Sequence, residues 1–139
     1  MMSMIAGATL GRQERIKSRK LIDELFTGGN SSSMAAFPLR VVYATADRSA
    51  VADESAAAQM MVSVSKRHFK RAVKRNRVKR QVREAYRLNK QILLPVLEQH
   101  PETVVRLAFI WQADELYSTA AVVRCMQKLL QRVAEKLSV

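Results

Sequence analysis

The 139-residue chain is poor in the residues that build disulfide frameworks and tight turns. It has one cysteine, Cys125, with four glycines and three prolines. A single cysteine excludes an internal disulfide and fits a reducing compartment, so we expect a cytoplasmic protein. No run of about 18 apolar residues exists, which excludes a transmembrane helix. Residues 1–10 lack a basic segment and a long apolar segment, so we expect residues 1–9 to form a flexible tail rather than a signal peptide.

Catalytic and metal-binding patterns are missing as well. His68 and His100 have no partners at the spacing of a zinc site, and no glycine-rich phosphate loop occurs. Cys125 falls on the apolar stripe of a predicted helix and is interpreted as a packing residue. Trp111 ends a predicted strand and is interpreted as core. His68 sits among basic residues, and we interpret it as a contact to a polyanion such as RNA rather than as a general base. The sequence therefore predicts no catalytic residue and no metal site on the protein.

Acidic residues are scarce in one segment, and this scarcity creates most of the net charge. The chain carries 24 Lys and Arg against 12 Asp and Glu, a net charge of +12. Residues 66–90 hold twelve basic residues and one acid, Glu84, while the rest of the chain is nearly neutral. So concentrated a charge indicates a polyanionic partner, with nucleic acid the first candidate and an anionic membrane the second.

Hydrophobic periodicity predicts an α+β fold in one domain over residues 10–139, with the order α-β-β-α-β-α. Ser18 and Ser118 are predicted helix N-caps, Gly28 and Gly29 end the first helix, and residues 30–33 form a polar loop. The predicted helices cover 18–27, 72–88 and the segment after Ser118; the predicted strands cover 39–45, 61–65 and 104–111; and residues 46–59 are expected to form a flexible loop.

The basic helix has two distinct sides. At 100° per residue, Val78, Val82 and Ala85 share one side and predict a buried face. Like charges at i, i+3 and i+4 repel by a few tenths of a kcal/mol per pair, and phosphates between them would reverse that effect. The opposite arc contains Asn76, Lys79, Arg80, Arg83, Arg87 and Lys90.

Two neighbouring stretches carry a family resemblance. Residues 63–67 have the sequence S-V-S-K-R, and residues 72–84 have the sequence A-V-K-R-N-R-V-K-R-Q-V-R-E. Together they closely resemble the signature of the bacterial ribonuclease P protein family, over about residues 10–135. The resemblance implies an α/β sandwich with a central sheet and a left-handed βαβ crossover. It also implies the non-catalytic protein subunit of an endoribonuclease that removes the 5′ leader from precursor tRNA. The RNA subunit would carry the chemistry and bind most of the Mg²⁺.

The resemblance, together with the charge of residues 66–90, assigns two sets of site residues, with ribonuclease P RNA and precursor tRNA as partners. The RNA-binding set is Lys66, Arg67, Lys70, Arg71, Lys74, Arg75, Asn76, Arg77, Lys79, Arg80, Arg83 and Arg87. The leader-binding cleft is expected to contain Ile22, Phe26, Tyr43, Ser63 and Ser65. Aromatic faces beside cations suit an unpaired strand without demanding a particular sequence.

Other classes of protein remain possible on the residues alone. A ribosomal-type, structural rRNA-binding protein would share the composition and the fold class. A basic DNA-binding helix would need a dimerisation element or a helix-turn-helix, whereas strands flank this helix. A membrane-surface helix would need large apolar residues opposite the bases, and Val78, Val82 and Ala85 are too small to anchor well.

Overall fold

The structure is a computed structural model that describes residues 14–16, 19–27, 29, 31–50 and 57–138. The predicted tail over 1–9, the N-cap at Ser18, Gly28 and the middle of the 46–59 loop lie outside these ranges. Within them, no helix combines the length and the apolarity that crossing a bilayer requires.

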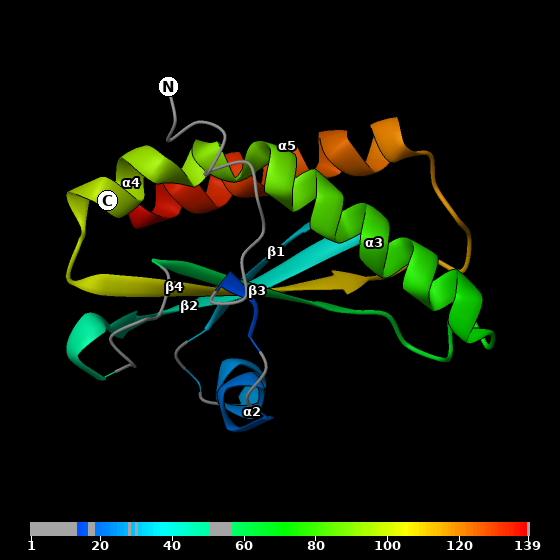
Figure 1. Cartoon of the computed structure of the whole chain (residues 1–139), viewed down its shortest axis with the longest axis horizontal. Coiled ribbons are helices and arrows are strands. Elements are labelled where there is room, and N and C mark those ends of the chain that lie inside the picture. Colours follow the sequence, from blue (N-terminus) through cyan, green and yellow to red (C-terminus); the bar gives the residue numbers. More distant parts are fainter. Residues whose placement is uncertain (1–13, 17–18, 28, 30, 51–56, 139) are drawn as a thin grey trace.

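Four strands form one mixed sheet in the order β1-β2-β4-β3 (Figure 1). The strands are β1 (Ser32–Ala36), β2 (Leu39–Asp47), β3 (Ala58–Ser63) and β4 (Thr103–Trp111). β1 pairs with β2 and β2 with β4 in antiparallel fashion, while β3 and β4 are parallel. Parallel neighbours need a crossover connection, and the chain between β3 and β4 supplies it with α3 (Ala72–Asn89), η3 (Lys90–Leu93) and α4 (Leu94–Gln99).

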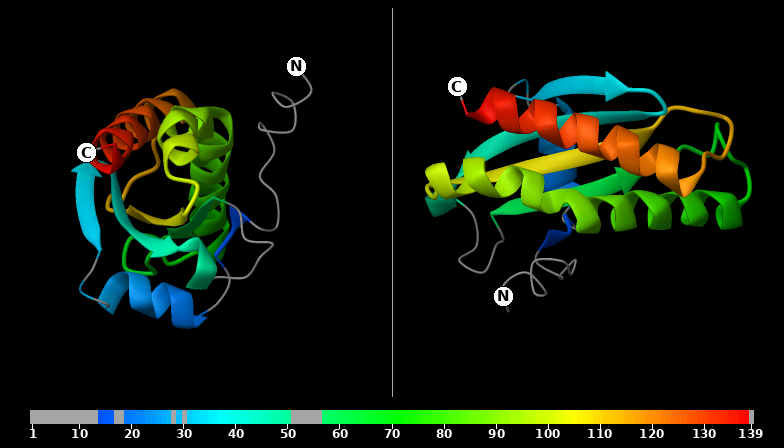
Figure 2. Two further views of the ribbon diagram at one scale, coloured as in Figure 1. Left: turned by 90° about the vertical axis from the view of Figure 1, so that its left-hand side faces the viewer. Right: turned by 90° about the horizontal axis from the view of Figure 1, so that it is seen from above.

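The helices lie on both faces of the sheet. α3 and α5 (Thr119–Leu137) run side by side over one face, and α2 (Arg19–Thr27) lies on the other (Figures 1 and 2). The Oγ of Ser118 accepts a hydrogen bond of 3.2 Å from the backbone N–H of Ala121, which confirms the predicted cap of the last helix.

The main core lies between the sheet and the α3–α5 pair. Alternate residues of β2 and β4 point into it, among them Val41 and Phe109, which are fully buried. On the other face Ile16, Leu25 and Ala108 form a second, smaller cluster beneath α2. The sheet therefore carries one large and one small apolar layer, and the small layer leaves more of its face uncovered.

Three predicted boundaries are wrong. β1 begins at Ser32, inside the predicted polar loop over 30–33. Its Ser-Ser-Met-Ala-Ala sequence has little β propensity, and these residues form a strand only because they pair with β2. The expected loop over 46–59 is shorter, since 46–47 continue β2, Arg48–Ala50 form the 3₁₀ helix η2, and 58–59 begin β3. β3 therefore covers Ala58–Ser63 rather than 61–65, and the element order gains a strand. The handedness of the crossover stays a prediction.

Candidate RNA interface

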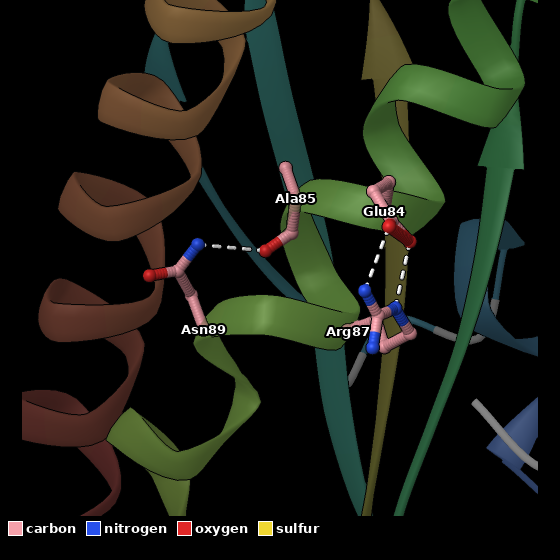
Figure 3. Close-up of polar contacts among 4 residues, drawn as sticks. All are labelled: Glu84, Ala85, Arg87 and Asn89. Carbon is pink, nitrogen blue, oxygen red and sulfur yellow. Dashed lines mark hydrogen bonds and ion pairs between the residues drawn. The ribbon is translucent and has the colours of Figure 1, made fainter. Parts of the chain in front are cut away.

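The buried side of α3 is the one predicted from its sequence. Val78, Val82 and Ala85 are buried, and they are joined by Tyr86 and Asn89. Figure 3 shows the Nδ2 of Asn89 donating to the backbone oxygen of Ala85, at 2.8 Å. The Oδ1 of Asn89 accepts from the Nε2 of Gln127 on α5, at 3.1 Å. This buried amide links the two helices and fixes which side of α3 faces outward.

The twelve residues assigned to RNA binding lie at the surface, to different extents. Four of them, Arg75, Lys79, Arg83 and Arg87, are half-buried, and the other eight are exposed. The one acid of residues 66–90, Glu84, makes two bonds of 2.7 Å to Arg87 (Figure 3), and this bonding lowers the pKa of Glu84. One acid cannot neutralise the remaining cations, so the outward side of α3 is strongly basic.

The turn between β3 and α3 presents several of these cations. The backbone N–H groups of His68 and Phe69 both donate to the carbonyl of Ser65, at 3.1 and 3.4 Å. The Oγ of Ser65 accepts from the N–H of Arg67, at 3.1 Å, and the Phe69 ring is buried. The turn is thus anchored by one aromatic side chain while its basic residues stay exposed. These are Lys66, Arg67, Lys70 and Arg71.

The first arginine of the R-N-R sequence bonds to this turn. The Nη1 of Arg75 donates to the carbonyls of Phe69 and Lys70, at 2.7 and 2.8 Å. By contrast, the next two residues, Asn76 and Arg77, are exposed. Arg75 therefore supports the shape of the turn, and the neighbouring side chains provide the groups available to a partner.

His68 holds the same turn from the other side. Its Nδ1 lies 2.7 Å from the Oδ1 of Asp114, in the segment between β4 and α5. The imidazole is mostly covered, whereas the carboxylate is largely exposed. The contact ties the turn to the segment that precedes α5. The interpretation of His68 as an RNA contact stays a prediction.

The residues assigned to the leader cleft do not all lie together. Ile22 packs in the small cluster under α2, and Phe26 on the same helix has 42% of its surface exposed. Tyr43 is only 7% exposed and belongs to the main core, on the face of the sheet covered by α3 and α5. The placement of Tyr43 in the α2 cleft is therefore wrong. It alternates with Val42, which does pack on the α2 side.

The two serines assigned to the cleft lie in different places. Val62 and Val64 are buried in the main core, so Ser63, which lies between them, points to the α2 side and is half-buried. Ser65 lies beyond the end of β3 and is exposed. A cation that the sequence analysis did not assign also lies here. The Nη1 of Arg106, on β4, is 4.0 Å from the Oε2 of Glu24 on α2.

A second unassigned cation, Arg15, faces α3 across a cavity. The cavity has a volume of about 490 Å³ and is lined by Arg15, Asn76, Arg80, Arg83, Glu84 and Arg87. Partial burial, and then the charge of Arg15, lower the pKa of the Arg83 guanidinium. No local pattern around Arg15 reveals this position, because the contact depends on a β-bridge to Met60, far along the chain.

The remaining candidate groups have structural surroundings. Trp111 is fully buried, as interpreted from the sequence. Cys125 packs against the main core, its Sγ lies 3.5 Å from the carbonyl of Phe37, and burial raises the pKa of its thiol. In the ranges that the structure describes, no three His, Cys, Asp or Glu side chains come close enough together to hold a metal ion.

The fold and the site define a small α+β protein that presents a cationic helix and turn to a polyanion. A sequence profile of the family described as Ribonuclease P matches residues 10–134. Two ribonuclease P protein components from strains of Porphyromonas gingivalis are similar to the chain. One is 46% identical over 125 residues, covering 90% of this chain and 86% of the relative; the other is 44% identical over 133 residues, covering 94% and 92%.

Solved structures agree on the fold. The ribonuclease P protein from Thermotoga maritima superimposes with a TM-score of 0.63 at 21% identity, covering 86% of this chain and 96% of that one. A mutant ribonuclease P protein from Staphylococcus aureus gives 0.59 at 20% identity, covering 96% and 94%. The chain belongs to the ribonuclease P protein family. It is thus the protein subunit of an endoribonuclease holoenzyme that acts in tRNA 5′ maturation, with the ribonuclease P RNA as its partner.

Proposed function

We propose that the two faces of the sheet divide the binding work of the subunit. The outward side of α3 and the 65–71 turn bind the ribonuclease P RNA. The α2 side binds the 5′ leader of precursor tRNA. The observation that carries this proposal is the concentration of exposed cations on α3 and its turn. The helix α3 covers the face of the sheet opposite α2 (Figure 2).

The RNA-binding half of the proposal rests on charge and preorganisation. Exposed Lys and Arg side chains release counterions when they neutralise phosphates, which supplies affinity without reading sequence. The turn is already held by Arg75 and by the His68–Asp114 contact, so little ordering is needed on binding. Asn76 is exposed beside these cations and can bond to a sugar or a base edge.

The leader-binding half is supported by the composition of the α2 side. Phe26 offers an exposed aromatic face, Ile22 and Ser63 lie on the same side of the sheet, and Arg106 adds a cation there. Unpaired bases stack on such rings with little sequence preference, while cations follow the backbone. Tyr43 is not part of this surface.

We also propose that the RNA subunit holds the Mg²⁺ ions that carry out hydrolysis. Hard cations such as Mg²⁺ bind carboxylates and other oxygen ligands. The described residues do not fit such a site, since the candidate interface is basic and its one acid, Glu84, is bonded to Arg87. The protein then contributes substrate affinity and stabilises the folded RNA, and we expect it to work in the cytoplasm.

Reconstitution tests this division of labour. We expect the purified protein alone to leave precursor tRNA uncut, because neither the sequence motifs nor the residues that the structure describes present a catalytic constellation. With a bacterial ribonuclease P RNA at low Mg²⁺, we expect the protein to make cleavage faster than it is with that RNA alone. The Lys and Arg side chains of the bound protein offset the phosphate repulsion that Mg²⁺ otherwise screens. The measurement is the single-turnover cleavage rate as a function of Mg²⁺ concentration.

The control in this assay is the same RNA preparation with a heat-denatured sample of the protein. Cleavage by protein that is free of RNA would contradict the proposal. So would an equal rate with and without native protein at every Mg²⁺ concentration, because the subunit would then contribute neither affinity nor RNA stability.

A further inference from the structure

The segment that carries Arg15 is fixed to the domain on both sides of this residue. The backbone N–H of Ile16 donates to the carbonyl of Met60, at 2.9 Å, and Arg15 forms a parallel bridge with Met60 at the free edge of β3. Ile16 is buried in the small cluster under α2. Glu14 binds the Nζ of Lys90 at 2.7 and 2.8 Å. The position of Arg15 opposite α3 is therefore built into the fold.

The cavity between Arg15 and α3 concentrates like charges. Its lining includes four arginines and one acid, and that acid, Glu84, bonds with Arg87. Among the ion pairs of the described residues, none involves Arg15, Arg80 or Arg83. The three guanidinium groups thus line one cavity without a carboxylate partner there.

This convergence is unfavourable unless an anion enters the cavity. Arg80 and Arg83 are three residues apart on α3, so they repel each other on one helix face, and Arg15 adds a third charge from a different element. The lowered pKa of Arg83, caused first by burial and then by Arg15, agrees with mutual repulsion. Guanidinium groups bind phosphate through paired N–H bonds, and a single phosphate can accept from several of them.

We propose that Arg15, Arg80 and Arg83 form a pocket for one phosphate group, and that this group belongs to an RNA strand lying along α3. Asn76 lines the same cavity and places an amide beside the phosphate or its ribose. A second cavity of about 240 Å³ shares Arg15 and Arg83 and continues along Met60, Met61 and Val62 of β3. The pocket therefore lies at the edge of the sheet, where the α3 side meets the α2 side.

The assignment of this phosphate to an RNA strand rests on the function proposed above, whereas the existence of the pocket does not. Two probes separate them: inorganic phosphate, titrated against the protein alone, and the ribonuclease P RNA. The test variant is Arg15→Gln, which removes the charge while Glu14 and Ile16 keep the segment anchored. The matched control is Arg124→Gln, an exposed arginine on α5 outside the cavity.

In the first arm, the arginine Nε–H signals are followed by NMR during the phosphate titration. In the wild type we expect the signals of Arg15, Arg80 and Arg83 to shift together with one dissociation constant for phosphate. This constant should rise roughly tenfold in Arg15→Gln and stay unchanged in Arg124→Gln. Phosphate affinity in Arg15→Gln equal to that of the wild type would overturn the pocket, as would shifts scattered over all surface arginines.

In the second arm, RNA affinity is measured against salt concentration. We expect Arg15→Gln to reduce the magnitude of the log K versus log salt slope by about 0.7–0.9, the loss of one phosphate contact. A normal slope combined with weakened phosphate binding would overturn the RNA source and leave a pocket for free phosphate. If wild-type protein failed to bind the RNA, the proposed function would fail, and the first arm would still decide whether the pocket exists.

Discussion

Replacing Arg75 with alanine is expected to destabilise the protein and weaken RNA binding together. The Nη1 of Arg75 bonds to the carbonyls of Phe69 and Lys70 from a half-buried position. Hydrogen bonds of this kind to charged groups contribute about 1.5–3 kcal/mol, so we expect the free energy of unfolding to fall by about that amount. Affinity for the ribonuclease P RNA should fall roughly tenfold, because the cations of the turn lose their fixed positions. Denaturant unfolding and RNA titration measure the two effects.

Arg77→Ala is the matched control, since it removes the same charge two residues further along the helix. Arg77 is exposed, so its loss should change stability by less than about 0.5 kcal/mol. It should reduce the magnitude of the salt slope by about 0.7–0.9, as one lost phosphate contact does. If the two variants lose equal stability and equal slope, the distinction between a supporting Arg75 and a binding Arg77 is wrong.

The features of α3 that the sequence predicts are those set within the helix. The spacing of Val78, Val82 and Ala85 determines the buried side whatever they pack against, and the structure confirms them as core. The cap at Ser118 is equally local, because the bond to Ala121 spans three residues. The concentration of charge in residues 66–90 can be counted from the sequence without a structure. Local periodicity and composition were therefore sufficient for the basic helix, whereas the family came from the motif resemblance of residues 63–67 and 72–84.

Features that depend on pairing between distant segments were missed. β1 has a sequence typical of a loop and becomes a strand because β2 follows it and pairs with it in register from Ser32–Tyr43 to Ala36–Leu39. Arg15 meets α3 only because its segment bridges Met60 at the edge of β3. Neither contact leaves a periodic signal in the sequence.

Tyr43 shows a different kind of failure. Alternation along β2 places Leu39, Val41 and Tyr43 on one face of the sheet, and this could be deduced from the sequence. The face that α2 covers could not be deduced from the sequence, because it depends on how this helix crosses the sheet. Once α2 packs against Val42 and Ala44, Tyr43 must lie under α3 and α5. Assigning a strand residue to a cleft therefore requires knowing which face of the sheet the residue lies on, as well as its position along the strand.

Phe26→Ala is expected to weaken binding of leader-bearing precursor while leaving mature tRNA almost unaffected. With 42% of its surface exposed, Phe26 is not sealed in the core, and its ring is open to stack on an unpaired base. Losing such a platform costs about 1–3 kcal/mol per stacked base, which is roughly 5- to 150-fold in affinity. The holoenzyme reconstituted with each variant is titrated with the two RNAs, and a thermal melt of each protein is recorded beside the binding curves.

The control for this change is Phe37→Ala. Phe37 is another exposed phenylalanine, with 63% of its surface accessible, but it lies on the turn between β1 and β2 and makes an edge contact with Tyr117 before α5. Its loss should leave the preference for leader-bearing precursor intact, because no part of the α2 side changes. Equal losses for precursor and mature tRNA in Phe26→Ala, together with a large drop in melting temperature, would mean that Phe26 packs the domain. A selective loss with a nearly unchanged melt assigns it to the leader.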